Sequence, residues 1–141
     1  MRIKKLNQNA RMPIRATLGS TGLDLYSCES LMLWFGDTGF ISTGIALAFD
    51  PGVYGILCLR SSMCKEGVIM PTGVGIIDND YRDEILIPVT CNKKPGITIK
   101  AGVRVAQIVL SRVIIPEKIN LVDEFYDSCD RLGGFGSTGS S

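Results

Sequence analysis

Short stretches rich in β-branched residues recur along this chain, separated by turn signals about every 8–12 residues. Residues 40–60, FISTGIALAFDPGVYGILCLR, predict two strands joined at 50–52, where Asp-Pro-Gly favours a turn because proline presets φ and glycine accepts a positive φ. Residues 84–115 predict three more strands, with breaks at 94–96 and 100–102. The pattern therefore predicts an all-β fold, a jelly-roll-like barrel or sandwich of many short strands.

One short helix is predicted over residues 61–68, SSMCKEGV, with a serine as its N-cap and Gly67 at its end. The length of 141 residues suits one folded core and is too short for two ordinary domains. By composition, the glycine-rich end at 131–141, RLGGFGSTGSS, is typical of a frayed terminus.

Charge and hydropathy exclude several classes of function. The formal net charge of +1 leaves no basic surplus for binding nucleic acid through its phosphates, although a local arginine cluster would still suit a small anion. No apolar run approaches the roughly 18 residues of a membrane span. The basic N-terminal stretch lacks the apolar core of a signal peptide, so we expect a cytoplasmic or nuclear protein that is not secreted and has no membrane partner.

The sequence contains no histidine, which excludes Ser-His and Cys-His couples and the HExxH zinc helix. If the chain is an enzyme, its proton acceptor is a carboxylate, or else a tuned lysine or tyrosine. The cysteines are odd in number and never spaced as CxxC, so we expect them to be buried reduced thiols; they are Cys28, Cys58, Cys64, Cys91 and Cys129. Five aromatic residues are expected in the core or at an interface: Trp34, Phe35, Phe40, Phe49 and Phe125.

Four stretches carry candidate site residues. Asp24 lies between leucines on a predicted strand, where it either faces solvent or holds a cation or its water shell. In LRSSM (59–63), an arginine and two hydroxyls meet a helix start, which suits an anion site or an ordinary serine cap beside a surface arginine. Gln107 lies among apolar residues on a predicted strand, where a core hydrogen bond and a ligand contact are both compatible with its amide.

The richest stretch is PTGVGIIDNDYRDEI (71–85). Gly73 and Gly75 let the backbone approach a planar polar ring closely. Asp78 follows two isoleucines, where a carboxylate at the edge of an apolar wall would polarise a water. The alternative is that residues 78–80, Asp-Asn-Asp, are acidic turn residues in solvent.

Taken in order, these stretches resemble the five motifs of the trimeric deoxyuridine triphosphatase (dUTPase) family, from about Ala10 to Gly139. The resemblance rests on PIRATLGSTGLDLYS (13–27), RSS (60–62), GIIDNDYRDEI (75–85), RVAQIVL (104–110) and GGFGSTG (133–139). It implies hydrolysis of dUTP to dUMP and pyrophosphate, which keeps uracil out of DNA and supplies dUMP for thymidylate synthesis.

The family's residue roles are implied for the matching positions. Asp78 would orient the water that attacks the α-phosphorus, and Tyr81 would pack under the deoxyribose and exclude a 2′-hydroxyl. The 73–85 backbone, including Gly73, Gly75 and Ile76, would pair with uracil. Arg60, Ser61, Ser62 and Gln107 would hold phosphates. Asp24 would contact Mg²⁺ through water. The remaining substrate contacts would come from the tail: Arg131, Phe135, Gly136, Ser137 and Thr138.

The resemblance also implies a homotrimer in which three subunits complete each active site. Residues 1–130 would form the β domain, and residues 131–141 would close a neighbour's site as a lid. The chain departs from the family pattern at Asp83, where glycine is usual, and at Arg131, which lies one residue closer to Phe135. Two alternatives stay open: the related dCTP deaminase branch, and a binding module of the same fold that has lost catalysis.

Overall fold

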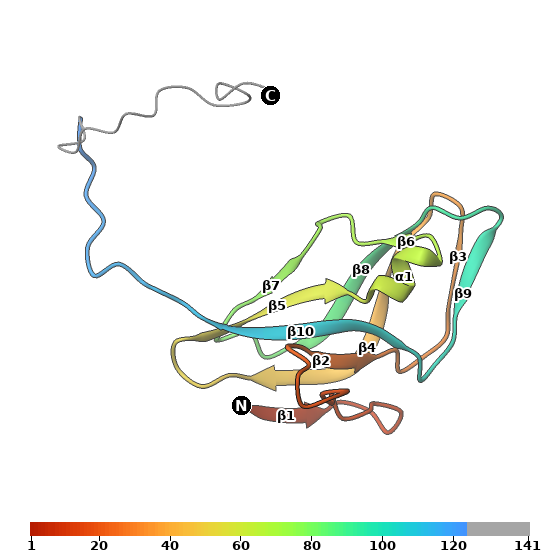
Figure 1. The fold of residues 1–141 in the computed structure, drawn as a ribbon, viewed down its shortest axis with the longest axis horizontal. Coiled ribbons are helices and arrows are strands. Elements are labelled where there is room, and N and C mark those ends of the chain that lie inside the picture. The colour runs from red at the N-terminus through yellow and green to blue at the C-terminus, as the bar shows by residue number, and fades with distance from the viewer. Residues whose placement is uncertain (124–141) are drawn as a thin grey trace.

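The computed structural model describes residues 1–123, which form short strands and one helix (Figure 1). In chain order the elements are β1 (Arg2–Lys5), β2 (Leu23–Tyr26), β3 (Leu31–Trp34), β4 (Thr38–Ala48), β5 (Val53–Leu59), α1 (Ser61–Lys65), β6 (Val68–Ile69), β7 (Gly75–Ile77), β8 (Glu84–Cys91), β9 (Gly96–Ile99) and β10 (Arg104–Arg112). The predicted all-β fold with one short helix is confirmed.

The strands form two four-stranded sheets, ordered β1-β4-β8-β6 and β2-β10-β5-β7, and a two-stranded sheet of β3 and β9. All strand pairs are antiparallel. Alternate residues of β8 point inward, as a pleated strand requires: Ile85, Ile87 and Val89 are fully buried. They join buried side chains of β5 and β10, such as Leu57 and Ile108, in one core. The two larger sheets therefore enclose a single hydrophobic core.

The predicted turn at 50–52 is confirmed, with Gly52 at a φ of +73°. It joins β4 to β5, and these two strands pair with different neighbours in different sheets. The turn therefore carries the chain from one sheet to the other. The three strands predicted over 84–115 are also present, as β8, β9 and β10.

The helix is shorter than predicted and has a different cap. α1 ends at Lys65, and Gly67 follows with a φ of +79°, consistent with its predicted role as the stop. The predicted serine cap is wrong: Arg60 occupies the N-cap position, and no side chain caps the helix. Ser61 and Ser62 lie inside the first turn instead. Within residues 1–123, no helix has the length and apolar character needed to cross a membrane.

The cysteine and aromatic predictions hold in part. Cys28 and Cys91 are buried free thiols and Cys58 is half-buried, but Cys64 on α1 is exposed, so its expected burial is wrong. Phe49 is in the core. Three aromatics are about half exposed in the single chain: Trp34, Phe35 and Phe40. Cys129 and Phe125 lie outside the described residues.

Candidate functional site

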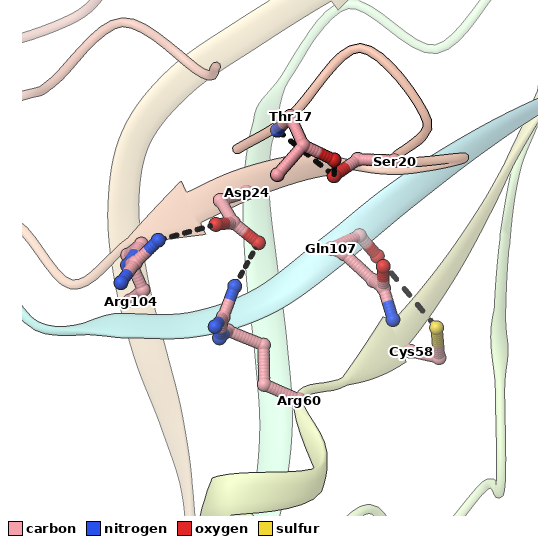
Figure 2. Close-up of polar contacts among 7 residues, drawn as sticks. All are labelled: Thr17, Ser20, Asp24, Cys58, Arg60, Arg104 and Gln107. Atoms are coloured by element: carbon pink, nitrogen blue, oxygen red, sulfur yellow. Dashed lines mark hydrogen bonds and ion pairs between the residues drawn. The ribbon is translucent and has the colours of Figure 1, made fainter. Parts of the chain in front are cut away.

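A buried carboxylate held by two arginines lies at one end of the β2-β10-β5-β7 sheet (Figure 2). Asp24 on β2 is only 4% exposed. Its Oδ1 accepts a hydrogen bond from Arg60 Nη1, and its Oδ2 accepts one from Arg104 Nη1 at 3.1 Å. Two guanidiniums around one carboxylate leave one net positive charge, and each guanidinium keeps further N–H donors. The cluster therefore suits an anion. Asp24 does not face solvent.

Arg104 is a member of this cluster that the sequence reasoning missed. It lies at the start of β10, opposite Tyr26, beside a shift in the register of β10 against β2. An arginine beginning an apolar strand carries no local signal of a buried partner. Only the pairing of β10 with β2 brings the Arg104 guanidinium to Asp24.

Gln107 lies beside the cluster. Its Cα is in register with that of Asp24 on one side and that of Cys58 on the other. A Cβ added to Gly22 would lie 2.6 Å from Gln107 Oε1, so the glutamine side chain packs directly over that glycine. Gln107 is half-buried, and its backbone carbonyl accepts a hydrogen bond from Cys58 Sγ at 3.9 Å (Figure 2). Three of the predicted stretches thus meet at one place.

The start of α1 adds two hydroxyls to the same end of the sheet. Arg60 follows β5 directly, and its backbone N–H donates to the Val105 carbonyl at 3.1 Å, which fixes the end of β5 against β10. Ser61 and Ser62 follow on α1, and both are exposed.

Beyond the helix, Glu66 accepts a hydrogen bond from Lys93 Nζ at 2.9 Å. This hydrogen bond and the lysine charge lower the pKa of Glu66 below its ordinary value.

Asp78 lies in a separate place, in the loop that follows β7. Its side chain is exposed and lines a cavity of about 700 Å³. The cavity walls come from the end of β7, the 78–80 loop, β5 and the residues after β10: Tyr54, Ile76, Asp78, Asn79, Asp80, Arg112, Val113, Ile114 and Ile115. The predicted position of Asp78 beside apolar residues is confirmed.

Hydrogen bonds within residues 78–84 fix the conformation of the loop after β7. The Tyr81 N–H donates to the Asp78 carbonyl at 3.2 Å, and Arg82 Nη1 donates to the carbonyls of Asn79 at 2.6 Å and Tyr81 at 2.8 Å. The Tyr81 hydroxyl donates to the Glu84 carbonyl at 2.9 Å. Gly73 before β7 has a φ of +72°, and Gly75 on β7 pairs with Leu57. The loop therefore presents Asp78 and Tyr81 from a well-connected backbone.

Within one chain, Asp78 is far from the Asp24 cluster. Ile77 pairs with Gly55, which places Asp78 near Tyr54 at the start of β5, whereas Arg60 follows the end of β5. Residues 54 to 60 span about 20 Å along an extended strand. A small ligand on the Arg60 side therefore does not reach Asp78 of the same chain. The tail residues predicted to contact substrate lie outside the described residues: Arg131, Phe135, Gly136, Ser137 and Thr138.

Within residues 1–123, no three histidine, cysteine, aspartate or glutamate side chains gather in a group that could hold a metal ion. Asp24 is buried, and each of its oxygens accepts a hydrogen bond from an arginine. The described residues therefore do not fit direct enclosure of a bare metal ion at Asp24, and any contact of this carboxylate with a metal would be through water.

Comparison with known proteins gives one consistent result. The sequence profile of the dUTPase family matches residues 8–139. A protein of Hahella chejuensis named deoxyuridine 5′-triphosphate nucleotidohydrolase is 39% identical, over 97% of this chain and 92% of that protein. A protein of Yarrowia lipolytica with the same name is 33% identical, over 99% of this chain and 88% of that protein.

The fold agrees with solved structures of the same family. The dUTPase of Staphylococcus bacteriophage 80alpha, solved with dUpNHpp, has a TM-score of 0.91 and 26% identity, covering 99% of this chain and 98% of that one. A mutant dUTPase of phage phi11 of S. aureus, described with a structural Mg(II) ion, shares the fold with a TM-score of 0.83 at 23% identity, covering 89% of this chain and 98% of that one. The profile match over most of the chain and these relatives establish that the chain belongs to the dUTPase family.

Proposed function

We propose that this chain hydrolyses dUTP to dUMP and pyrophosphate. Relatives at 33–39% identity over nearly the whole chain carry the name of that activity. The main structural support is that one sheet holds two candidate parts of an active site. The arginines around Asp24 form an anion site at one end of the sheet, and Asp78 is exposed at the other end. Removing dUTP keeps uracil out of DNA, and the dUMP produced serves thymidylate synthesis.

The phosphates of dUTP bind at the Asp24 cluster. Arg60, Ser61 and Ser62 offer guanidinium and hydroxyl donors, and Gln107 offers an amide beside them. Asp24 holds Arg60 by one Nη, so the guanidinium is oriented before the substrate arrives. Such preorganised donors stabilise the charge that develops on the phosphates during reaction.

The reaction requires a single base. Asp78 accepts a proton from a water molecule while the oxygen of that water forms a bond to the α-phosphorus. The bond between the α-phosphorus and the bridging oxygen breaks, and pyrophosphate leaves with its electron pair. Pyrophosphate is a good leaving group, so positioning and charge neutralisation with one carboxylate base suffice, without histidine.

Recognition of the base and sugar belongs to the 73–85 segment and the tail. The backbone at Gly73, Gly75 and Ile76 pairs with the uracil edge, and Tyr81 packs under the deoxyribose and excludes a 2′-hydroxyl. From the tail, residues 131–141 close over the substrate as a lid. Phe135 stacks on uracil, and the terminal phosphates are held by Arg131, Gly136, Ser137 and Thr138.

Mg²⁺ is the proposed cofactor, and when bound it would supply positive charge that offsets the negative charge of the phosphates. Asp24 is the residue that would contact it through water. Its direct ligands would come mainly from the triphosphate, in keeping with the way Mg²⁺ retains much of its hydration.

The family resemblance implies that the active form is a homotrimer, and the separation of the parts of the site within one chain supports a site shared between subunits. About 20 Å of β5 lies between Asp78 and Arg60, so a neighbouring subunit supplies Asp78 to the arginine cluster. Residues 113–123 support this assembly. They leave apolar side chains open to solvent, with Ile114 at 93% and Ile119 at 86% exposure, which a second copy would cover.

Pyrophosphate release from dUTP, dCTP, dTTP and UTP, with and without Mg²⁺, tests the proposal. The full chain is expected to release pyrophosphate from dUTP with Mg²⁺ and little from the others, and a chain truncated before Arg131 is expected to lose most of this activity. Ammonia release from dCTP would indicate a deaminase instead. Tight binding of dUTP without hydrolysis would indicate a binding module.

A further inference from the structure

The side chain of Asn79 ties the Asp78 loop to the β4–β5 turn. Asn79 Nδ2 donates one hydrogen bond to the Asp50 carbonyl at 2.7 Å and another to the Val53 carbonyl at 2.8 Å. These two carbonyls lie at the two ends of the turn, which is itself closed by the Val53 N–H donating to the Asp50 carbonyl at 3.1 Å. A single amide group therefore uses both of its protons to bind one turn.

The Asp78 carboxylate has no comparable support of its own. In the described part of the chain, its side chain makes no hydrogen bond, and it is exposed at the cavity wall. Its placement therefore depends on the loop backbone. That backbone is held by Arg82 through the Asn79 carbonyl, and by the Asn79 side chain through the turn.

We propose that Asn79 is a positioning residue that holds Asp78 in place for proton transfer. This inference rests on the proposed role of Asp78 as the base. A misplacement of about 1 Å of a reacting group costs on the order of 100-fold in rate, so two hydrogen bonds that fix the neighbouring residue matter for the chemical step.

The same turn also holds the chain that leaves β10. The Gly52 carbonyl accepts a hydrogen bond from the Val113 N–H at 3.0 Å. The turn thus supports both the Asp78 loop and residues 113–115, which line the same cavity. The phosphate-binding residues lie at the far end of β5. Loss of the Asn79 contacts therefore affects Asp78 without disturbing Arg60.

The test compares Asn79→Ala, Asn79→Asp and Asn79→Ser in the full chain. Alanine and aspartate supply no donor, whereas serine supplies one. We expect kcat for dUTP to fall about 10- to 100-fold in the first two and less in Asn79→Ser, with KM nearly unchanged. Asn92→Ala and Asn92→Asp are the matched controls, because Asn92 is exposed on the segment after β8. Thermal unfolding of each variant reports on folding, and Asn79→Ser carries the comparison if Asn79→Ala does not fold.

A double-mutant cycle with Asp78→Asn separates positioning from a general structural role. Once the base is absent, Asn79→Ala is expected to lower the residual rate no further. Wild-type kcat in all three Asn79 variants, a change confined to KM, or an undiminished further loss in the Asp78→Asn background would overturn the inference. If Asp78→Asn retains only a low residual rate while the Asn79 variants are fully active, only the positioning role fails. If Asp78→Asn is fully active, the role of Asp78 fails and the role of Asn79 fails with it.

Discussion

The Asp24 carboxylate is stabilised by charge on both sides. Burying a carboxylate costs several kcal/mol unless charged hydrogen bonds replace its water. Here Arg60 and Arg104 supply one such bond to each oxygen, while their own side chains stay partly open to solvent. The same contacts orient the Arg60 guanidinium, so one residue serves both the stability of the sheet end and the proposed phosphate site.

Asp24→Asn tests this dual role. Asparagine keeps the shape but removes the charge and leaves an amide N–H₂ facing a guanidinium. We expect the free energy of unfolding to fall by about 1–3 kcal/mol and dUTP turnover to fall with it. Denaturant unfolding and pyrophosphate release measure the two effects. Glu29→Gln, at an exposed position, removes the same charge and is expected to change neither. Equal free energies of unfolding and equal dUTP turnover in the two variants would contradict this dual role of Asp24.

The strand β9 can lie against β3 because of a glycine. Gly96 pairs with Trp34, and a Cβ added to Gly96 would lie 2.4 Å from the Leu33 carbonyl oxygen. Real Cβ atoms do not approach backbone oxygen so closely, so the strands would have to separate.

Gly96→Ala is therefore expected to destabilise the fold by about 1–3 kcal/mol, measured by denaturant unfolding. Gly19→Ala is the control, since a Cβ there would meet no atom within 4 Å. A Gly96→Ala variant as stable as Gly19→Ala would show that β3 and β9 pair less closely than described.

The element-level predictions succeeded where local chemistry decides the structure. The turn at Asp50-Pro51-Gly52 and the strand breaks after β8 and β9 follow from proline and glycine dihedral preferences. The sheet assignment of β4 and β5 did not follow, because hydrogen-bond partners far apart in sequence decide it. The serine cap failed for a related reason: the pairing of Arg60 with Val105 extends the strand geometry to Arg60 and places Ser61 inside the helix.

The site was predictable to the extent that its residues are unusual where they stand. Asp24 between leucines and Asp78 after two isoleucines were candidate site residues in the sequence, each with a solvent-facing residue as the alternative, and the structure shows that Asp24 is buried. Arg104 and Asn79 gave no such indication. Arg104 meets Asp24 through the β2–β10 register, and the proposed role of Asn79 depends on a turn nearly thirty positions earlier in the chain.

For the molecule as a whole, the segment after β10 is the part of the described chain that best supports the proposed assembly. Ile114 and Ile115 are 93% and 75% exposed, and Leu121 is fully exposed. Each such side chain gains about 1.5–3 kcal/mol when it is buried. A second copy that covers this segment would recover that free energy.

The double variant Ile114→Ser/Ile115→Ser is expected to weaken the proposed trimer while the unfolding of the single domain changes little. Sedimentation equilibrium over a range of protein concentrations measures the shift toward monomer. Leu18→Ser, which changes an equally exposed residue of the 15–20 loop, is the control. An unchanged association constant in the double variant would contradict a role for this segment in assembly.

In the proposed trimer, dUTP hydrolysis uses Asp78 of one subunit with Arg60 of another. Complementation between two strongly impaired variants, Asp78→Asn and Arg60→Gln, tests this arrangement. Equal amounts are unfolded together, refolded, and assayed for pyrophosphate release from dUTP with Mg²⁺. Random mixing in a cyclic trimer leaves about a quarter of the sites with both wild-type residues, so we predict about a quarter of wild-type activity. A refolded mixture of trimers as inactive as its two components would contradict the shared site.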